Sequence, residues 1–361
     1  MRGIWRRRTL LPAVILTISL AACSGGGTPE PAPVAATKGA QGAPAAPAAP
    51  RLTRDDAQEA LDRYLATDDV LRAGGDLRMA LEQVRDGQSA ITSAAYRSTV
   101  LQPPRYRWRP TGLIVPRLDA PPYWFTAVVE REARSATLGA TATRTSTRTA
   151  GAPDPAAARS AVLTLMKQDD DARWQLSFAS LLYPGDKLPE PALDADGYAT
   201  ALSSRDESIE ITPQLMAPLH ATVAEEGAKG FSAALIAPDT HTTGYSTEIT
   251  EKRDQAKDVG LGYDSIFSAT QSPIFAWRTR GGGGVVCYPL TRTTTYSARL
   301  PSAPWIVVPP DARWAIGDPA VAKELRIVET QQYVSVVPPR ATHGAARVIA
   351  YDGAVTRVTG R

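Results

Sequence analysis

The hydrophobic pattern of this chain changes period near residue 100, and this change limits the possible folds most. Before it, Ala57, Leu61 and Leu65 recur at the spacing of one helical face. After it, residues 106–115 and 123–133 are rich in aromatic and β-branched side chains, and in the second segment both alternating sets can be covered, as in a buried strand. We therefore expect helices followed by a sheet.

The helical part carries clear boundary signals. Thr53 followed by Asp55 and Asp56 predicts a capped helix start, because the hydroxyl can accept a free backbone N–H and the acids favour the positive helix end. Gly74-Gly75 predicts the end of this helix. A second helix is expected from Asp76, with a break at Gly87 and a continuation over residues 90–96.

The sheet that follows contains the clearest hairpin of the chain. Residues 161–167 and 173–183 are predicted strands, joined by the polar residues 168–172. Residues 134–158 have no periodicity and are predicted to form a long loop. The predicted strands are therefore antiparallel.

Two helices before a long-stranded antiparallel sheet resemble the nuclear-transport-factor-2-like (cystatin-like) cone fold. In that family a charged turn often precedes an aromatic strand, and here residues 171–176 read Asp-Ala-Arg-Trp-Gln-Leu. The resemblance covers roughly residues 52–185. It implies a curved sheet wrapped around the helices.

The same order of elements returns in the second half. Thr212-Pro213 predicts a helix start, with Leu215, Leu219 and Val223 on one face. A polar helix is expected at 242–258 and strands at 264–269, 274–280, 285–295, 324–337 and 345–358, with a turn at Asp352-Gly353. We thus predict an α+β fold of two domains, 51–190 and 212–361, each with helices followed by a curved, cone-like antiparallel sheet, and a connector at 191–211.

The N-terminus is predicted to be an export signal. Residues 1–8 are basic, residues 10–22 are largely apolar, and Leu20-Ala21-Ala22-Cys23 closes the segment. This resembles the bacterial lipoprotein signal, which implies cleavage between Ala22 and Cys23 and a diacylglyceryl group on Cys23. An ordinary secreted protein with a chance Cys is the alternative. Residues 23–50 are rich in Gly, Pro and Ala and are predicted to be a disordered tether.

These parts together predict an extracytoplasmic protein that is attached to the outer face of the cell membrane by lipid. Their order is similar to that of two-domain lipoproteins of unknown function in high-GC Gram-positive bacteria, a resemblance that implies no activity. The chain has 40 basic and 37 acidic residues. Without the four signal arginines the balance is 36 to 37, near neutral, which argues against a nucleic-acid partner.

No motif for catalysis, metal or cofactor binding is present in the sequence. His220, His241 and His343 are isolated from each other and from cysteine, so a zinc site lacks its usual ligands and no cofactor is expected. Asp169-Asp170-Asp171 could offer oxygens to calcium, but a solvated turn is the simpler interpretation. Gly281–Gly284 lacks the Lys-Ser/Thr of a phosphate loop and is predicted to be a hairpin tip. With Cys23 lipidated, Cys287 is alone in a predicted strand and is interpreted as a buried thiol.

Tryptophans are the remaining candidates for contact residues. Trp124, Trp174 and Trp277 fall in predicted strands, where they either fill the core or line a pocket. Trp305 and Trp314 lie in a proline-rich insertion, where they either pin the loop to the domain or contact a partner.

We expect a non-enzymatic binding or scaffold module for an envelope protein or another envelope component. The alternative is a carrier or sensor of a small apolar ligand in a cone-shaped pocket. An enzyme that uses an acid in the cone is a third hypothesis, for which the sequence singles out no acid.

Overall fold

The computed structural model describes residues 51–99, 102–134 and 158–361. The predicted signal, Cys23, the tether and nearly all of the long loop at 134–158 lie outside this part of the chain. Residues 49–361 form one compact unit. The account below concerns that unit alone.

Three helices open the described chain. They are α1 (Arg54–Gly74), α2 (Leu77–Glu82) and α3 (Asp86–Arg97). The predicted start and end of the first helix are confirmed, but the break expected at Gly87 lies at residues 83–85, and Gly87 is inside the third helix. Thr53 Oγ1 accepts from the N–H of Asp56 at 3.1 Å, and the Asp56 carboxylate accepts from the N–H of Thr53 at 3.2 Å, which is a complete capping box. Gly75 ends α1 in the left-handed conformation, with φ of 68°.

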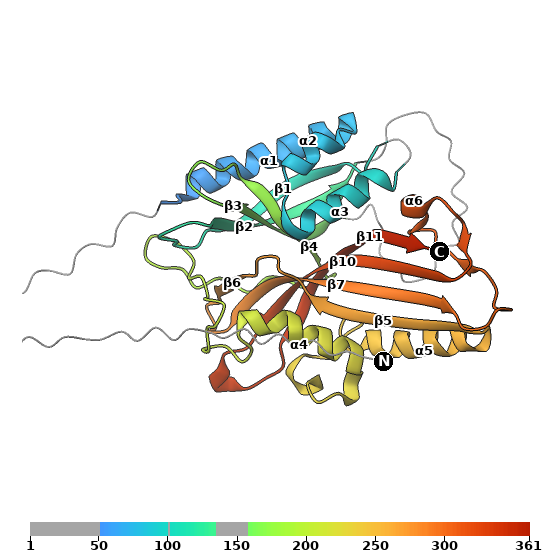
Figure 1. Ribbon diagram of the computed structural model, residues 1–361. Helices are drawn as coiled ribbons and strands as arrows, with labels where there is room; N and C mark the ends of the chain where they lie inside the picture. The colour runs from blue at the N-terminus through green and yellow to red at the C-terminus, as the bar shows by residue number, and fades with distance from the viewer. Residues whose placement is uncertain (1–50, 100–101, 135–157) are drawn as a thin grey trace, which may run out of the picture. The chain divides into compact units, whose positions relative to one another are not determined.

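Four antiparallel strands follow the helices: β1 (Tyr106–Ile114), β2 (Tyr123–Ala133), β3 (Arg159–Lys167) and β4 (Gln175–Leu182). The hairpin that we expected at residues 161–183 is confirmed as β3 and β4. Helix α1 lies against β1 and α3 lies against β4 (Figure 1).

The second half repeats helices before strands. Its helices are α4 (Pro213–Glu226) and α5 (Gly244–Asp258), with short 3₁₀ turns at Gly227–Lys229 and Ala233–Leu235. They pack on β5 (Leu261–Ala269), and α4 also contacts β7 (Gly284–Ala298), as Figure 1 shows. The remaining elements are β6 (Phe275–Arg278), β8 (Ile306–Val307), α6 (Arg313–Ile316), β9 (Ala320–Val321), β10 (Glu324–Val337), a 3₁₀ turn at Arg340–Thr342 and β11 (Arg347–Gly360).

One large antiparallel sheet joins the strands of both halves. Its order is β1-β2-β3-β4-β11-β10-β7-β5, with β6 paired to β7. β8 and β9 form a separate two-stranded sheet. The fold is therefore a mixed α and β structure with a large open antiparallel sheet and a few helices, and the junction of the two halves is the pairing of β4 with β11.

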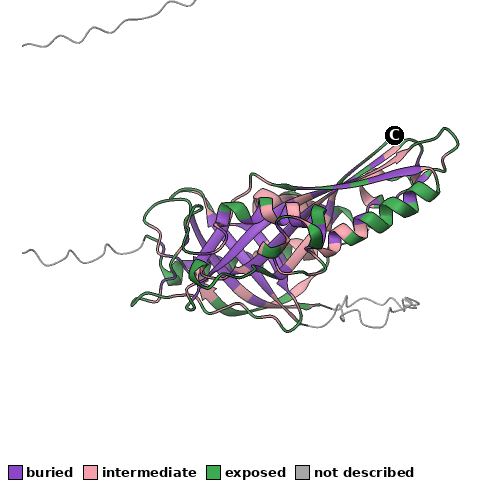
Figure 2. Ribbon diagram, turned by 90° about the horizontal axis from the view of Figure 1, so that it is seen from below, coloured by how far each residue is buried: buried purple, intermediate pink, exposed green. Residues whose placement is uncertain are grey.

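Burial follows this layering, and the strands at the centre of the sheet are mostly buried (Figure 2). One apolar cluster belongs to α1 and β1–β4, and another to α4, α5 and the C-terminal strands. A third cluster spans the junction, where Trp124 and Phe178 of the first half meet Phe275, Trp277 and Ile349 of the second.

Two details of the second half differ from our expectations. Leu215 of α4 is 46% exposed, whereas Met216 and Val223 are fully buried, so the buried face of α4 is rotated from the expected one. The turn expected at Asp352-Gly353 is wrong. β11 runs through these residues in register with Gln332 and Gln331 of β10, because cross-strand pairing on a long partner outweighs a local turn signal.

Candidate functional site

The large sheet is paired over only a short length where its two halves meet. β4 is paired along its length with β3, but it pairs with β11 only at Ala350↔Leu182 and Tyr351↔Leu181. β11 continues to Gly360 on β10 alone. Beyond Tyr351, the edge of β11 that is turned toward β4 therefore has no paired strand. Helix α3 packs against both β4 and β11.

A cavity of about 640 Å³ lies at this opening, and we call it the central cavity. Both halves contribute walls. The first supplies residues of α1, α3, β1–β4, and the second supplies the α6 segment, β10 and β11. The volume falls in the range of about 300–1,000 Å³ that is usual for small-molecule sites.

Aromatic rings line much of the central cavity. Tyr106 and Trp108 of β1 lie with ring centroids 5.5 Å apart and tilted by 59°, and Trp314 and Tyr351 come from the second half. Such rings offer flat apolar surface to a bound molecule.

Two residues that line the central cavity each have a buried polar side-chain atom without a hydrogen-bond partner among the described residues. Gln88 of α3 is only 6% exposed; its Nε2 donates to Thr92 Oγ1 at 3.4 Å, and its Oε1 has no hydrogen-bond partner among the described residues. Trp108 Nε1 is buried and likewise has no acceptor in the described chain. A buried polar group without a partner costs about 1–3 kcal/mol, and native proteins contain few of them. Both residues line the central cavity.

The charges of the central cavity are divided between its walls. Arg72 and Arg131 come from the first half, with their guanidinium carbons 5.4 and 4.5 Å from the Tyr106 ring centroid. Asp311, Glu329 and Asp352 come from the second half. Opposite walls of opposite sign suit an oriented polar ligand.

Burial perturbs two of the acids. Desolvation raises the pKa of Asp352, and the positive charge of Arg131 only partly offsets this effect. Desolvation also raises the pKa of Glu329, against the opposing effect of Arg292, whose Nε lies 3.8 Å from the Glu329 carboxylate. Acids with raised pKa in a concave site are typical of functional positions.

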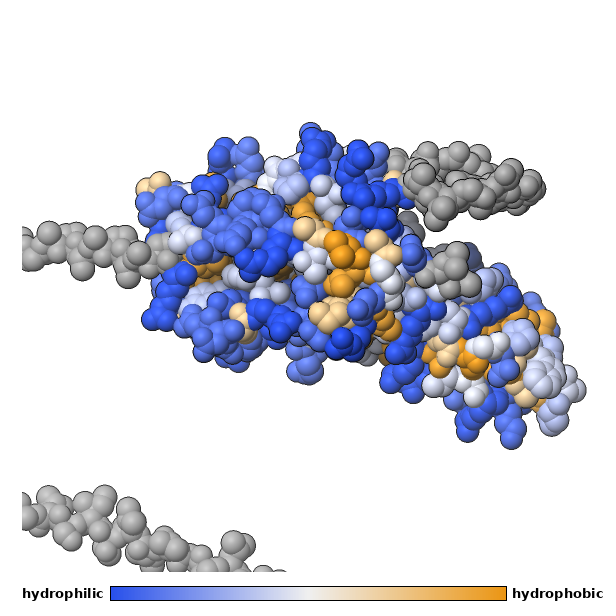
Figure 3. Space-filling model, turned by 90° about the horizontal axis from the view of Figure 1, so that it is seen from above, coloured by the Kyte–Doolittle hydropathy of each residue, from blue (hydrophilic) through white to orange (hydrophobic). Residues whose placement is uncertain are grey.

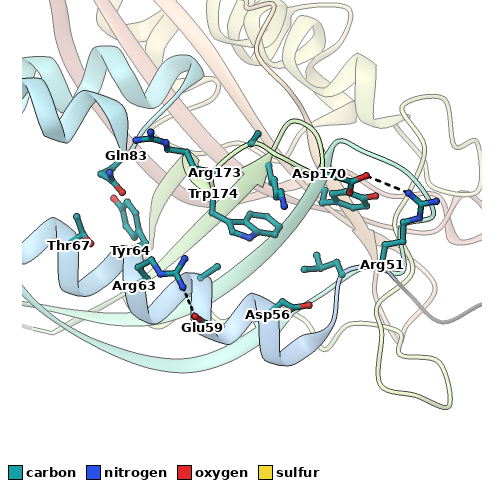
Figure 4. A pocket seen from close by; sticks show the side chains of 15 residues that line it. Arg51, Asp56, Glu59, Arg63, Tyr64, Thr67, Gln83, Asp170, Arg173 and Trp174 are labelled. Carbon is teal, nitrogen blue, oxygen red and sulfur yellow. Dashed lines mark hydrogen bonds and ion pairs between the residues drawn. The ribbon is translucent and has the colours of Figure 1, made fainter.

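A second hollow of about 610 Å³ lies between α1 and the β3–β4 hairpin, and we call it the hairpin cleft (Figure 4). Arg51 pairs with Asp170 at 3.6 Å, and Arg63 pairs with Glu59, as the dashed lines show. Tyr64 lines both hollows. Because these charges are already paired and exposed, the hairpin cleft is the weaker candidate for a specific site.

The structure separates the tryptophans that the sequence singled out. Trp124, 9% exposed, packs on Phe275 at 5.4 Å, and Trp277 is fully buried in the same cluster, so neither lines either hollow. Trp174 lines the hairpin cleft and meets Phe125 edge to face at 5.0 Å. Trp314 lines the central cavity.

Trp305 lies apart from both hollows. It is 66% exposed beside β8, and Val307 of β8 is exposed to the same extent. The face drawn in Figure 3 is largely hydrophilic, with scattered apolar patches. Single exposed apolar side chains are common on protein surfaces.

Sequence reasoning missed most of the central cavity. Gln88, Glu329 and Asp352 carry no motif, and Gln88 lies more than two hundred residues before the strands that carry the other two. Only Trp314 was among the candidates. The turn signal at Asp352-Gly353 was noticed and misinterpreted, although it lies in the cavity wall.

Two of the three isolated histidines, His220 and His241, are brought into contact with tyrosines. His220 Nδ1 lies 2.9 Å from Tyr288 Oη, and Tyr183 Oη lies 2.7 Å from His241 Nδ1. His220 and Tyr288 are completely buried. Cys287 is a buried free thiol, as we expected, and burial raises its pKa.

In the described residues, no group of three or more His, Cys, Asp and Glu side chains is placed to hold a metal ion. Among the helices of this part of the chain, none is both long and apolar enough to cross a membrane.

Comparison with protein families gives one match. Residues 48–360 match a family described as "Domain of unknown function (DUF8094)". The chain belongs to this family. The matched range contains every described helix and strand, so the DUF8094 domain includes both halves of the sheet and the central cavity. No curated protein and no solved structure matches the chain.

Proposed function

We propose that this DUF8094 protein is a lipid-anchored, extracytoplasmic binding protein that holds a small molecule in the central cavity. The observation that carries the proposal is the cavity of about 640 Å³ between the two halves, which is lined by aromatic and charged side chains.

The composition of the walls differs from what the alternative hypothesis, a carrier of a small apolar ligand, would need. Charged groups lie beside the rings of Trp108, Trp314 and Tyr351, so the cavity suits a molecule with both a flat apolar part and polar groups. The proposal is for binding without catalysis, and its support is the lack of any catalytic motif in the sequence.

The location rests on Leu20-Ala21-Ala22-Cys23 and the basic, apolar segment before it. We propose cleavage before Cys23, lipid on its sulfur and attachment to the outer face of the membrane. Stable anchoring needs more than one acyl chain, which the lipoprotein modification supplies.

We also keep the two-domain arrangement as a proposal: residues 51–190 and 212–361 as two cone-like units with a connector at 191–211. Its support is that each half has helices before strands and an apolar cluster of its own.

The test is native mass spectrometry of the full-length protein, extracted with mild detergent from the membranes of its own host. We expect the wild type to carry a bound small mass. Trp108→Ala should raise the dissociation constant by about tenfold, the effect of losing about 1.4 kcal/mol of binding free energy, and so lower the bound fraction. Trp305→Ala is the matched control, because Trp305 lines neither hollow, and it should leave the bound fraction unchanged.

A wild-type protein that is bare under the same conditions contradicts the proposal, as does equal loss of the bound mass in both variants. A bare protein would leave the scaffold function as the better hypothesis. The observation that favours that second candidate is the exposed pair of Trp305, next to β8, and Val307, on β8. Loss of a partner from an envelope pulldown with Trp305→Ala would support it.

A further inference from the structure

We propose that two copies of this chain associate through a twofold interface, in which Phe231 of each copy enters an apolar hollow of the other. The inference goes beyond the proposed function, because this surface shares no residue with the central cavity. Three observations carry it, namely the full exposure of Phe231, the apolar hollow beside it and two opposite charges next to it that have no partner.

Phe231 is more exposed than any other large apolar residue of the described chain. It is 99% exposed, whereas the other exposed residues of this kind lie between 46% and 67% and therefore lean on their neighbours. Burying one phenyl ring from this state strengthens an association by a factor of about 10–100. A ring held fully in solvent is thus a strong anchor for a partner.

Hydrogen-bonded turns fix the backbone on both sides of Phe231. The N–H of Gly230 donates to the oxygen of Gly227 at 3.0 Å, and the N–H of Ala233 donates to the oxygen of Gly230 at 3.1 Å. Ser232, the next residue, is only 8% exposed. An ordered backbone therefore presents the ring, which reduces the entropy that is lost when the ring is bound.

An apolar hollow of about 330 Å³ lies beside these turns, and we call it the alanine hollow. Ile236, which is completely buried, forms its floor. The other residues that line it are small or uncharged: Ala228, Ala233, Ala234, Pro238, Thr243 and Ala345. Small side chains leave room and offer no charge, so the alanine hollow can accept an aromatic ring.

The ring and most of the alanine hollow belong to one short segment, residues 227–238. In a twofold interface the same patch meets itself, so that a contact of the first copy with the second is repeated by the second with the first. A ring next to a hollow on one copy then faces a hollow next to a ring on the other. The patch is therefore self-complementary, and a single association buries two rings and fills two hollows.

The charges next to Phe231 favour the same partner. Glu226 and Lys229 are both exposed, and neither takes part in an ion pair among the described residues. Glu226 lies against the backbone that precedes the ring, because its Oε2 is 2.5 Å from the point that a Cβ on Gly230 would occupy. Across a twofold axis, Glu226 of each copy can pair with Lys229 of the other, so the charges of the patch are complementary to those of a second copy.

The charged residues on the other rim of the alanine hollow are already paired. His343 Nδ1 lies 3.4 Å from a carboxylate oxygen of Glu210, and Arg347 pairs with Asp186 at 2.6 Å. They stand on either side of Ala345 in the sequence. The charges that are left to select a partner are therefore those beside Phe231.

The experiment follows the dimer by native mass spectrometry of the full-length protein in mild detergent over a dilution series. We expect a wild-type mass of two chains that dissociates on dilution. Phe231→Ala should raise the dissociation constant by about 100-fold, because each dimer loses two rings and each ring contributes about tenfold. Leu215→Ala is the matched control, since Leu215 is exposed on α4 and does not line the alanine hollow, and it should leave the dissociation constant unchanged.

Glu226→Lys and Lys229→Glu test the twofold arrangement. Each single variant places like charges opposite each other twice in a dimer and should raise the dissociation constant by about tenfold. The double variant restores both ion pairs with their signs exchanged and should return the dissociation constant to within about threefold of the wild type. Thermal unfolding of every variant checks that it is folded.

Several outcomes would overturn the inference. They are a wild type that stays monomeric at the highest concentration of the series, a dimer that Phe231→Ala leaves unchanged, and a double charge variant that is no better than the single ones. A monomeric wild type whose binding to phosphatidylglycerol vesicles is weakened by Phe231→Ala would show that the ring contacts a membrane instead. Trp108→Ala should dimerise like the wild type, so failure of the dimer and failure of the proposed binding function are distinguished.

Discussion

His220 shows how the tertiary environment decides the chemistry of a single residue. Its ring is completely buried in α4, where Nδ1 lies 2.9 Å from Tyr288 Oη and Nε2 lies 2.6 Å from the backbone oxygen of His241. Tyr288 Oη in turn lies 2.9 Å from Ser335 Oγ. Both ring nitrogens are thus occupied, and the residue is a structural part of the core.

Burial lowers the pKa of His220 to about 4, and this predicts a pH-dependent stability. The unfolded chain takes up the proton near the ordinary pKa of about 6.5, whereas the folded chain resists it down to about 4. The stability contribution is therefore present above the unfolded pKa and is lost as the pH falls from about 6.5 to about 4, by about 3 kcal/mol in total.

Urea unfolding followed by tryptophan fluorescence at about pH 7 and about pH 4 measures this effect. His220→Gln should reduce the difference in unfolding free energy between the two pH values. His343→Gln is the control, because the side chain of His343 is 79% exposed, and it should retain the wild-type difference. An equal pH dependence in all three proteins would show that His220 does not contribute.

At the scale of elements, the helix starts depend on local chemistry and the strand ends on distant partners. The capping box at Thr53 involves four consecutive residues, so its geometry is a property of the sequence. By contrast, β11 passes through Asp352-Gly353 because β10 supplies a continuous partner on its other side. The Asp352 carboxylate accepts from the N–H of Gly353 at 2.9 Å.

The cap of α1 gives a prediction at this scale. Thr53→Ala removes the hydroxyl that accepts from the N–H of Asp56 and should lower the free energy of unfolding by about 1 kcal/mol. Thr53→Ser keeps an acceptor in the same place and should stay within a few tenths of a kcal/mol of the wild type. Denaturant titration of the three proteins measures the difference, and equal stability of Thr53→Ala and wild type would contradict a role for the cap.

At the scale of the whole molecule, the meeting of two halves creates the candidate site. The β4–β11 junction consists of two residue pairs, and the central cavity lies beside it with walls from both halves. The shared cluster around Trp124 and Trp277 holds the halves together on the other side of the same strands. A ligand in the cavity would contact both halves and so should stabilise their association.

The proposed anchor is tested on the full chain. Cys23→Ala should release the protein from the membrane or leave an uncleaved precursor, because the acyl chains have no other attachment point in the lipoprotein signal. Fractionation of host cells and the mass of the recovered protein measure both outcomes. Cys287→Ala is the matched control and should remain in the membrane fraction; attachment of Cys23→Ala at the wild-type level would contradict the anchor.

The sequence by itself determined the features that depend on neighbours along the chain. The start of α1 at Thr53, its end at Gly75, the β3–β4 hairpin and the burial of Cys287 were predicted from local patterns and are confirmed. Caps, glycine stops and short hairpins are formed by groups within a few residues of each other, so their energies can be inferred from local sequence.

Only the tertiary structure decided the continuity of the sheet and the composition of the central cavity. The first and second halves both line the central cavity because β4 and β11, about 170 residues apart, pair briefly and then separate. Trp124 and Trp277 have the same strand signals as Trp174, yet the first two fill the shared core and the third faces the hairpin cleft. A strand pattern gives the alternation of its faces, but what covers each face depends on long-range packing.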